Sequence, residues 1–300
     1  MRLIFGMKFL GDYLSVMSVS FLVFVPISIG ILTIMLSPKE MSDSYIFRIF
    51  APMAAIMVFL VSTTILNMEG LICWIMALPV FLVVASVTAV ITGAIRDSLY
   101  WKKTRLSVSL FILLPFLLAP IEQQVRIEPK LFTVNTSIQI NASPDKIWEN
   151  VVRVREIKES EDKGRLSKFM GFPRPIKAEL DSLKIGGVRK AIFSKGLVFD
   201  EKVKYYEHEK KMSFSITPLT EQIPATTLDE HVTIGGKYFT VLDGNYELEK
   251  IGENKYNLIL YSHFTMNTTF NFYSGLWSEL IMKDIQNNIL QVIKNRCENN

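Results

Sequence analysis

Residues capable of acid–base chemistry are most concentrated at Asp229-Glu230-His231. They fall in a run with the alternation of a β-strand, which places Glu230 on the opposite face from the other two, beside apolar neighbours. A carboxylate among apolar side chains has a raised pKa and can act as a general acid or base. A structural interpretation is favoured over this one: Glu230 pairs with Arg189 or Lys190 on another predicted strand, or faces solvent.

A second group lies on the last predicted strand, residues 256–266, where Tyr261 and His263 share a face. The alternative for His263 is a core or surface histidine with its hydrogen bonds satisfied. His208 lies between two glutamates in a charged turn, and we expect it to be solvated. The three histidines are dispersed, and we predict no metal site, no cofactor and no set of catalytic residues.

The predicted C-terminal helix carries a third group. Helical spacing places four residues of its first half on one face, namely Trp277, Leu280, Ile281 and Asp284. Asp284 is either a polar anchor among apolar neighbours or lies at the edge of that face, because charges are rarely buried unpaired. Gly-x-Ser-x-Gly, His-Glu-x-x-His and phosphate-binding glycine loops are absent from the sequence.

The first 121 residues contain four long stretches without charge, of 23, 18, 24 and 16 residues. About 20 apolar residues cross a bilayer as a helix. We therefore predict a transmembrane region over residues 1–121, with spans at about 14–36, 47–66, 71–94 and 106–121. The last stretch is short enough to be a re-entrant or interfacial segment instead. The first is longer than a signal-peptide core, and we expect it to be retained.

Charge distribution bears on topology and on partners. Six Lys and Arg residues flank the loops after the first and third spans, against four on the opposite side. The positive-inside rule then predicts a multi-pass integral membrane protein whose soluble part lies on the outer (periplasmic or extracellular) side, and this inverts if residues 106–121 do not cross. Residues 122–300 hold 25 basic and 24 acidic residues, so we expect no nucleic acid partner.

The polar half is predicted to be α+β. A linker at residues 122–130 precedes a strand at 131–140 and a helix that begins at Pro144 with Ser143 as its N-cap. A second short helix follows within residues 153–168. Glycine-containing turns then separate strands at 176–183, 188–194, 197–206, 212–216, 228–234, 237–242, 246–251 and 256–266. Residues 271–296 read as one long helix.

This order of elements resembles the START-like, or SRPBCC, superfamily, which includes polyketide cyclases and birch-pollen-allergen relatives. The resemblance rests on residues 138–148, Ile-Gln-Ile-Asn-Ala-Ser-Pro-Asp-Lys-Ile-Trp, and on the final helix, and it covers residues 131–298. It implies a helix-grip fold, in which a curved antiparallel sheet wraps around the C-terminal helix and leaves a cavity for an apolar ligand. Relatives carry lipids, sterols, polyketides or plant hormones, and a minority are enzymes.

We therefore predict a membrane-tethered domain that binds a lipid-like or other apolar small molecule, with Glu230, Tyr261, His263, Trp277, Leu280, Ile281 and Asp284 around it. The bilayer is the other expected partner, and the sequence does not indicate an oligomeric state. Two alternatives remain. One is an enzyme of the cyclase or aromatase kind that uses Glu230 or His231. The other is a protein-interaction or sensor domain whose cavity is filled by its own side chains.

Overall fold

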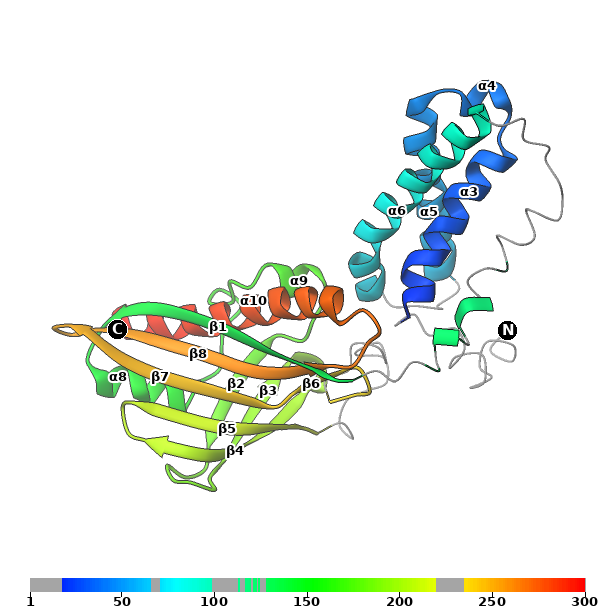
Figure 1. Cartoon of the computed structure of the whole chain (residues 1–300). Coiled ribbons are helices and arrows are strands. Elements are labelled where there is room, and N and C mark those ends of the chain that lie inside the picture. The colour runs from blue at the N-terminus through cyan, green and yellow to red at the C-terminus, as the bar shows by residue number, and fades with distance from the viewer. Residues whose placement is uncertain are drawn as a thin grey trace. The chain divides into compact units, whose positions relative to one another are not determined.

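The chain forms two compact units in a computed structural model that describes residues 18–65, 71–98, 113, 117–119, 121, 122, 124, 128–219 and 235–299. The first unit comprises Met1–Glu128 with Thr268–Phe270, and the second comprises Pro129–Asn267 with Asn271–Asn300. Figure 1 shows the helices of the first and the sheet of the second.

The first unit is helical and apolar. Its described elements are η1 (Ser20–Phe24), α3 (Val25–Leu36), α4 (Lys39–Ser42), α5 (Tyr45–Ile65) and α6 (Leu71–Ser98). Two helices, Tyr45–Thr63 and Ile72–Ser98, have the length and composition needed to cross a membrane, and a shorter apolar helix covers Ser20–Leu36. Of the four predicted spans, two therefore correspond to such helices among the described residues. Most of the predicted span 106–121 lies outside the residues that the structure describes.

Close packing and the hydrogen bonds of a buried arginine hold these helices together. Gly30 of α3 allows contact with α6, since a Cβ there would lie 2.5 Å from the carbonyl oxygen of Ala85. Arg48 of α5 is 1% exposed, and its guanidinium donates to Asp97 of α6 and to the carbonyl of Ser42, both at 2.6 Å. Buried polar groups need such partners, and these tie the ends of α4, α5 and α6 together.

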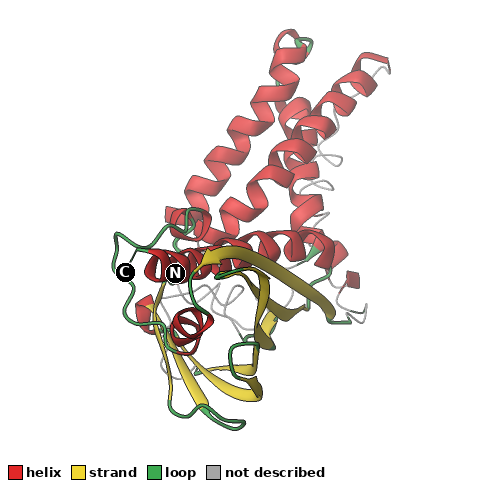
Figure 2. Ribbon diagram, turned by 90° about the vertical axis from the view of Figure 1, so that its left-hand side faces the viewer, coloured by secondary structure: helices red, strands yellow, loops and turns green. Residues whose placement is uncertain are grey.

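The second unit is a curved antiparallel sheet with helices. Its strands lie in the order β1-β8-β7-β5-β4-β3-β2, and β6 pairs with β8. Figure 2 shows the curvature of the sheet. The strands are β1 (Lys130–Asn141), β2 (Pro175–Leu180), β3 (Val188–Phe193), β4 (Val198–Glu207), β5 (Lys211–Pro218), β6 (Phe239–Val241), β7 (Asp243–Gly252) and β8 (Lys255–Met266). The helices are α8 (Pro144–Val152), α9 (Leu166–Phe169), η2 (Ser194–Gly196) and α10 (Asn271–Glu298).

Turn chemistry explains the two connections that flank β3. Gly186 has φ +88°, and Lys195 and Gly196 have φ +60° and +78°, so the predicted turns on both sides of β3 adopt left-handed backbone. The predicted turn at Asp243-Gly244 is wrong, because both residues belong to β7. Gly244 is needed there for space, since a Cβ would lie 2.6 Å from the Phe214 ring.

Helix α10 lies against the concave face of the sheet. Among the strands it contacts β1 most and β8 next, and Figure 1 shows it running beside them. Gln286 of α10 donates to Ser262 of β8 at 3.1 Å and accepts from Thr136 of β1 at 3.0 Å. Apolar residues of the sheet, α8 and α10 form the largest core of this unit. The second unit therefore has the α+β, helix-grip arrangement that the sequence predicted.

Helix α8 begins at Pro144 with Ser143 as its N-cap, as predicted, but Ser143 caps the helix through its backbone alone. The backbone carbonyl of Ser143 accepts from Ile147, while the Ser143 side chain makes no capping hydrogen bond. Ile147, Trp148 and Val151 are buried in the core, so tertiary packing fixes the position of this helix.

Candidate functional site

A pair of opposite charges lies buried on the concave face of the sheet. Arg189 of β3 and Glu201 of β4 are partners in the strand register, and they are 3% and 6% exposed. The Arg189 guanidinium donates to Glu201 Oε2 and lies 5.5 Å from the ring centre of Phe214 and 5.9 Å from that of Tyr246. Aromatic faces attract such cations, so four strands contribute to one polar cluster within an apolar interior.

Burial governs the electrostatics of this cluster. Burial raises the pKa of Glu201, with Arg189 opposing the shift. Burial also raises the pKa of Tyr246. Burial by itself would lower the pKa of Arg189, but the charges and hydrogen bonds of Glu201 and Tyr246 together outweigh burial and raise that pKa. The Nε–H of Arg189 has no hydrogen-bond partner among the described residues.

The cluster can therefore offer a donor and a positive charge to a polar group placed beside it. Glu201 already occupies one Arg189 nitrogen, and a second donates weakly to the carbonyl of Val151 at 3.5 Å. The remaining N–H would donate to an uncharged or anionic oxygen of a ligand.

The sequence contained a signal for this cluster that our predictions used only in part. Arg189 appeared there as a possible partner of Glu230. On β3, Arg189 is in phase with buried Ala191, and on β4, Glu201 is in phase with buried Phe199 and Val203. Charged residues at inward positions of two adjacent strands predict a buried pair.

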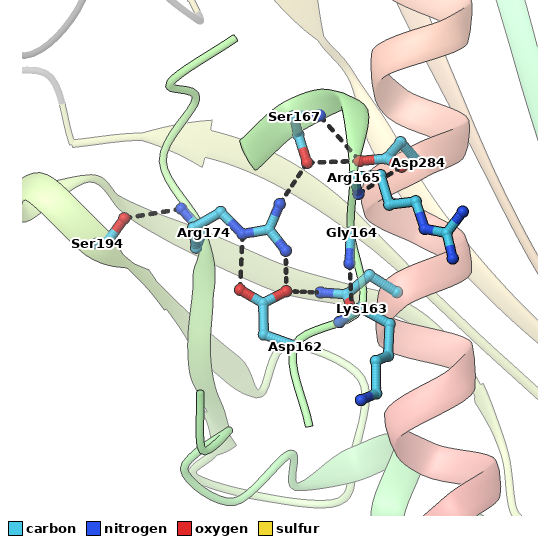
Figure 3. Close-up of polar contacts among 9 residues, drawn as sticks. Asp162, Lys163, Gly164, Arg165, Ser167, Arg174, Ser194 and Asp284 are labelled. Atoms are coloured by element: carbon cyan, nitrogen blue, oxygen red, sulfur yellow. Dashed lines mark hydrogen bonds and ion pairs between the residues drawn. The ribbon is translucent and has the colours of Figure 1, made fainter. Parts of the chain in front are cut away.

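A second polar network lies beside α10, and Figure 3 shows its members. Asp284 accepts from the Ser167 hydroxyl at 2.6 Å, from the Ser167 amide at 2.9 Å and from the Arg165 amide at 3.1 Å. Arg174 donates to the same hydroxyl at 2.5 Å and to Asp162 at 2.8 Å. The network fastens the segment around α9 to α10.

Asn288 extends this network one turn further along α10. Its side-chain oxygen accepts from the amides of Lys163 and Gly164, and its nitrogen donates to Asp162. Burial would raise the pKa of Asp284, but its hydrogen bonds from Ser167 and Arg165 lower it below the usual value. These carboxylate and amide groups have protein partners, so we assign them a structural role.

The predicted site residues are not brought together. Tyr261 and His263 lie on the convex face, opposite α10, since their neighbours Leu260, Ser262 and Phe264 are the buried ones. Tyr261 donates to Glu247 at 2.9 Å. The structure thus differs from the expectation that these two side chains line a space beside the helix.

The remaining predicted residues have separate surroundings. On α10, Ile281 is buried, Trp277 is partly buried and Leu280 is exposed, while Asp284 faces the α9 segment. At Asp284, this face of α10 therefore contacts the α9 segment rather than the sheet. Glu230 and His231 lie outside the described residues, so the cyclase-type hypothesis built on them stays a prediction.

Comparisons with known proteins concern this second unit. No protein-family model and no curated protein matches the sequence. Among solved structures, a START superfamily protein from Mycobacterium smegmatis is 10% identical, with a TM-score of 0.36 over 56% of this chain and 97% of its own. The ZhuI aromatase/cyclase from Streptomyces sp. R1128 is 11% identical, with a TM-score of 0.36 over 56% and 94%.

A third similar structure is DynU16, a protein of the dynemicin biosynthetic locus. It is 14% identical, with a TM-score of 0.30 over 53% of this chain, and the chain spans 46% of its length. Similarities this weak carry no conclusion about a ligand or a reaction, and the helix-grip assignment rests on the strand order and the position of α10.

Proposed function

We propose that the second unit binds a small, mainly apolar molecule between α10 and the concave face of the sheet, and that the first unit holds it at a membrane. The observation that carries the proposal is the buried cluster of Arg189, Glu201 and Tyr246. The ligand would direct a polar oxygen toward Arg189 and place its apolar part among the aliphatic and aromatic side chains of the interior.

Stability alone is a weak reason for such a cluster. A buried ion pair often contributes no more than well-packed apolar residues of similar volume would, because desolvation of both charges offsets their attraction. Ionisable groups with shifted pKa values in an apolar interior are instead typical of binding and catalytic sites. The Nε–H of Arg189, which has no partner among the described residues, adds a donor that a ligand could satisfy.

The exposed apolar surface of the first unit supports its part of the proposal. In both long helices, only 28% of the most apolar window is buried, whereas a core helix of a soluble protein is mostly buried. Large side chains such as Ile46, Val58 and Ile65 are among the exposed residues. A lipid environment would cover this surface.

The ends of these helices also support an orientation. Arg96 of α6 donates to the carbonyl of Ile34 and to Ser42, so it lies at the same end of the unit as Arg48. By the positive-inside rule this end faces the cytoplasm. The second unit would then lie on the outer side if residues 106–121 cross the bilayer, and on the inner side if they do not.

Native mass spectrometry of residues 122–300 tests the binding proposal. The segment is expressed without detergent, and circular dichroism first establishes that it is folded. We expect an added mass that organic extraction removes and that rebinding restores. Arg189→Met should lose this mass, while Lys190→Met, on the opposite face of the same strand, should keep it. A folded domain of bare mass that takes up no fatty acid or sterol would contradict the proposal.

A further inference from the structure

Three side chains with metal-ligating atoms converge away from the buried cluster. Asp145 lies in the first turn of α8, and His208 and Glu209 lie in the turn between β4 and β5. One ligand atom from each lies within 4.8 Å of the other two. The sequence separated Asp145 from the other two by about 60 residues, so only the fold brings them together.

The imidazole of His208 is oriented through its other nitrogen. Its Nδ1 lies 2.9 Å from the hydroxyl of Tyr206, which also accepts from the indole N–H of Trp148 at 3.2 Å. Trp148 is fully buried, so this chain of contacts anchors the ring to the core. The Nε2 atom is on the side of the carboxylates, 3.7 Å from Glu209 Oε1.

Glu209 is held in place by the backbone. It has φ +59°, a left-handed conformation that few residues other than glycine and asparagine adopt. One of its carboxylate oxygens lies within 4.8 Å of an oxygen of Asp145, and like charges at this distance repel each other. The adjacent Lys210 donates to Glu207 at 2.6 Å, so its ammonium group is already paired.

We infer that Asp145, His208 and Glu209 bind a divalent transition-metal ion, a site independent of the ligand proposed for the concave face. One imidazole and two carboxylates suit Zn²⁺ and similar ions, and three protein ligands leave a further coordination position for water. A ligating histidine whose other ring nitrogen is hydrogen-bonded is the usual arrangement in such sites. A bound ion would link the start of α8 to the β4–β5 turn.

Calorimetric titration of the full chain in detergent with Zn²⁺ tests this inference, after removal of any purification tag and of endogenous metal with a chelator. We expect one ion per chain and a higher melting temperature on binding. His208→Gln and Glu209→Gln should each lower the affinity by more than about 100-fold, and Tyr206→Phe by about 10- to 100-fold.

His263→Gln provides the matched control, because His263 also pairs with a carboxylate, that of Asp243, at 2.8 Å. It should leave the affinity unchanged. The melting temperature of each variant is also measured in chelator. A variant that melts like the native chain without metal is folded, so its lower affinity reflects loss of a contact at the metal site. Native affinity in both His208→Gln and Glu209→Gln, or no Zn²⁺ binding by the native chain, would overturn the assignment.

Discussion

Each unit contains a buried arginine paired with a carboxylate, and the two pairs differ in how their acidic partners meet solvent. In the first unit, the side chain of Arg48 is 2% exposed and that of Asp97 is 44% exposed. In the second, the side chains of Arg189 and Glu201 are 4% and 8% exposed. In the first pair the carboxylate is partly exposed to solvent, whereas in the second pair both charged groups are buried; we call the second the enclosed pair.

This difference is the reason that we assign a structural role to the first pair and propose a ligand for the second. Arg48 also donates to the carbonyl of Ser42, so its partners account for it as a link between helix ends. Arg189 has a nitrogen without a described partner, and both members of its pair have lost their hydration. The enclosed pair is therefore the one that a ligand would complete.

The largest expected effect comes from removing one partner of the enclosed pair. Glu201→Ala leaves Arg189 as an unpaired buried charge, and we expect it to lower the free energy of unfolding by about 3–5 kcal/mol. Asp97→Ala should cost less, about 1–3 kcal/mol, because water can reach that side of Arg48. Urea unfolding of each variant in the full chain measures both, and equal losses would show that exposure does not separate the pairs.

Replacing the whole enclosed pair sharpens the same comparison. Arg189→Met with Glu201→Leu keeps the volume and removes both desolvation costs, so we expect stability to be unchanged or to rise by about 1–4 kcal/mol. The double variant should nevertheless lose the bound molecule. Retention of that molecule at native stoichiometry would remove Arg189 from the proposed site.

A third prediction concerns Asp284, which fastens the α9 segment to α10. Asp284→Asn replaces a carboxylate oxygen with an amide donor, which cannot accept from Ser167 and Arg165 as before, and we expect a loss of about 1–3 kcal/mol at neutral pH. Because the folded-state pKa of Asp284 is lowered, its contribution is present above the unfolded value of about 3.9 and is lost as pH falls through the folded pKa.

Melting temperatures measured from neutral pH to below about pH 4 test this prediction. The native chain should lose stability in that acidic range, and the Asp284→Asn chain should lose less of it. Glu249→Gln, at an exposed position of β7, is the control and should follow the native curve. Parallel curves for the native and Asp284→Asn chains would assign the acid sensitivity to other carboxylates.

Local patterns predicted most of the described elements of the second unit. Strand β8 and helix α10 follow from alternation and from a long run without proline, and α8 follows from Pro144. The predicted turn at Asp243-Gly244 failed because the same dipeptide that favours a hairpin also suits a strand position where Phe214 leaves no room for a Cβ.

The candidate site was harder to predict because it depends on faces and on pairing over long distances. Alternation correctly grouped Tyr261 with His263, but Ile259 gave their face an apolar neighbour, and only the packing of α10 decides which face is inside. Likewise, Arg189 meets Glu201 through strand register, and Asp145 meets His208 through the position of α8 on the sheet. No local sequence motif predicts either of these two contacts.

The smallest expected effect lies on the convex face, where Lys211 pairs with Glu247 and with Tyr261. The side chains of Lys211 and Glu247 are 38% and 29% exposed, and their charged groups are 2.6 Å apart. A hydrated pair of this kind contributes about 1 kcal/mol or less to the free energy of unfolding, and salt screens it. We therefore expect Lys211→Met to lower stability only slightly, and to do so less at high ionic strength.

The loss of stability in Glu201→Ala should not depend on salt, because its partner Arg189 is buried. Urea unfolding measures both losses of free energy. If the loss for Lys211→Met were larger than that for Glu201→Ala and independent of salt, the convex face would hold the more strongly coupled charges. The buried pair of Arg189 and Glu201 would then no longer stand out as a candidate for ligand binding.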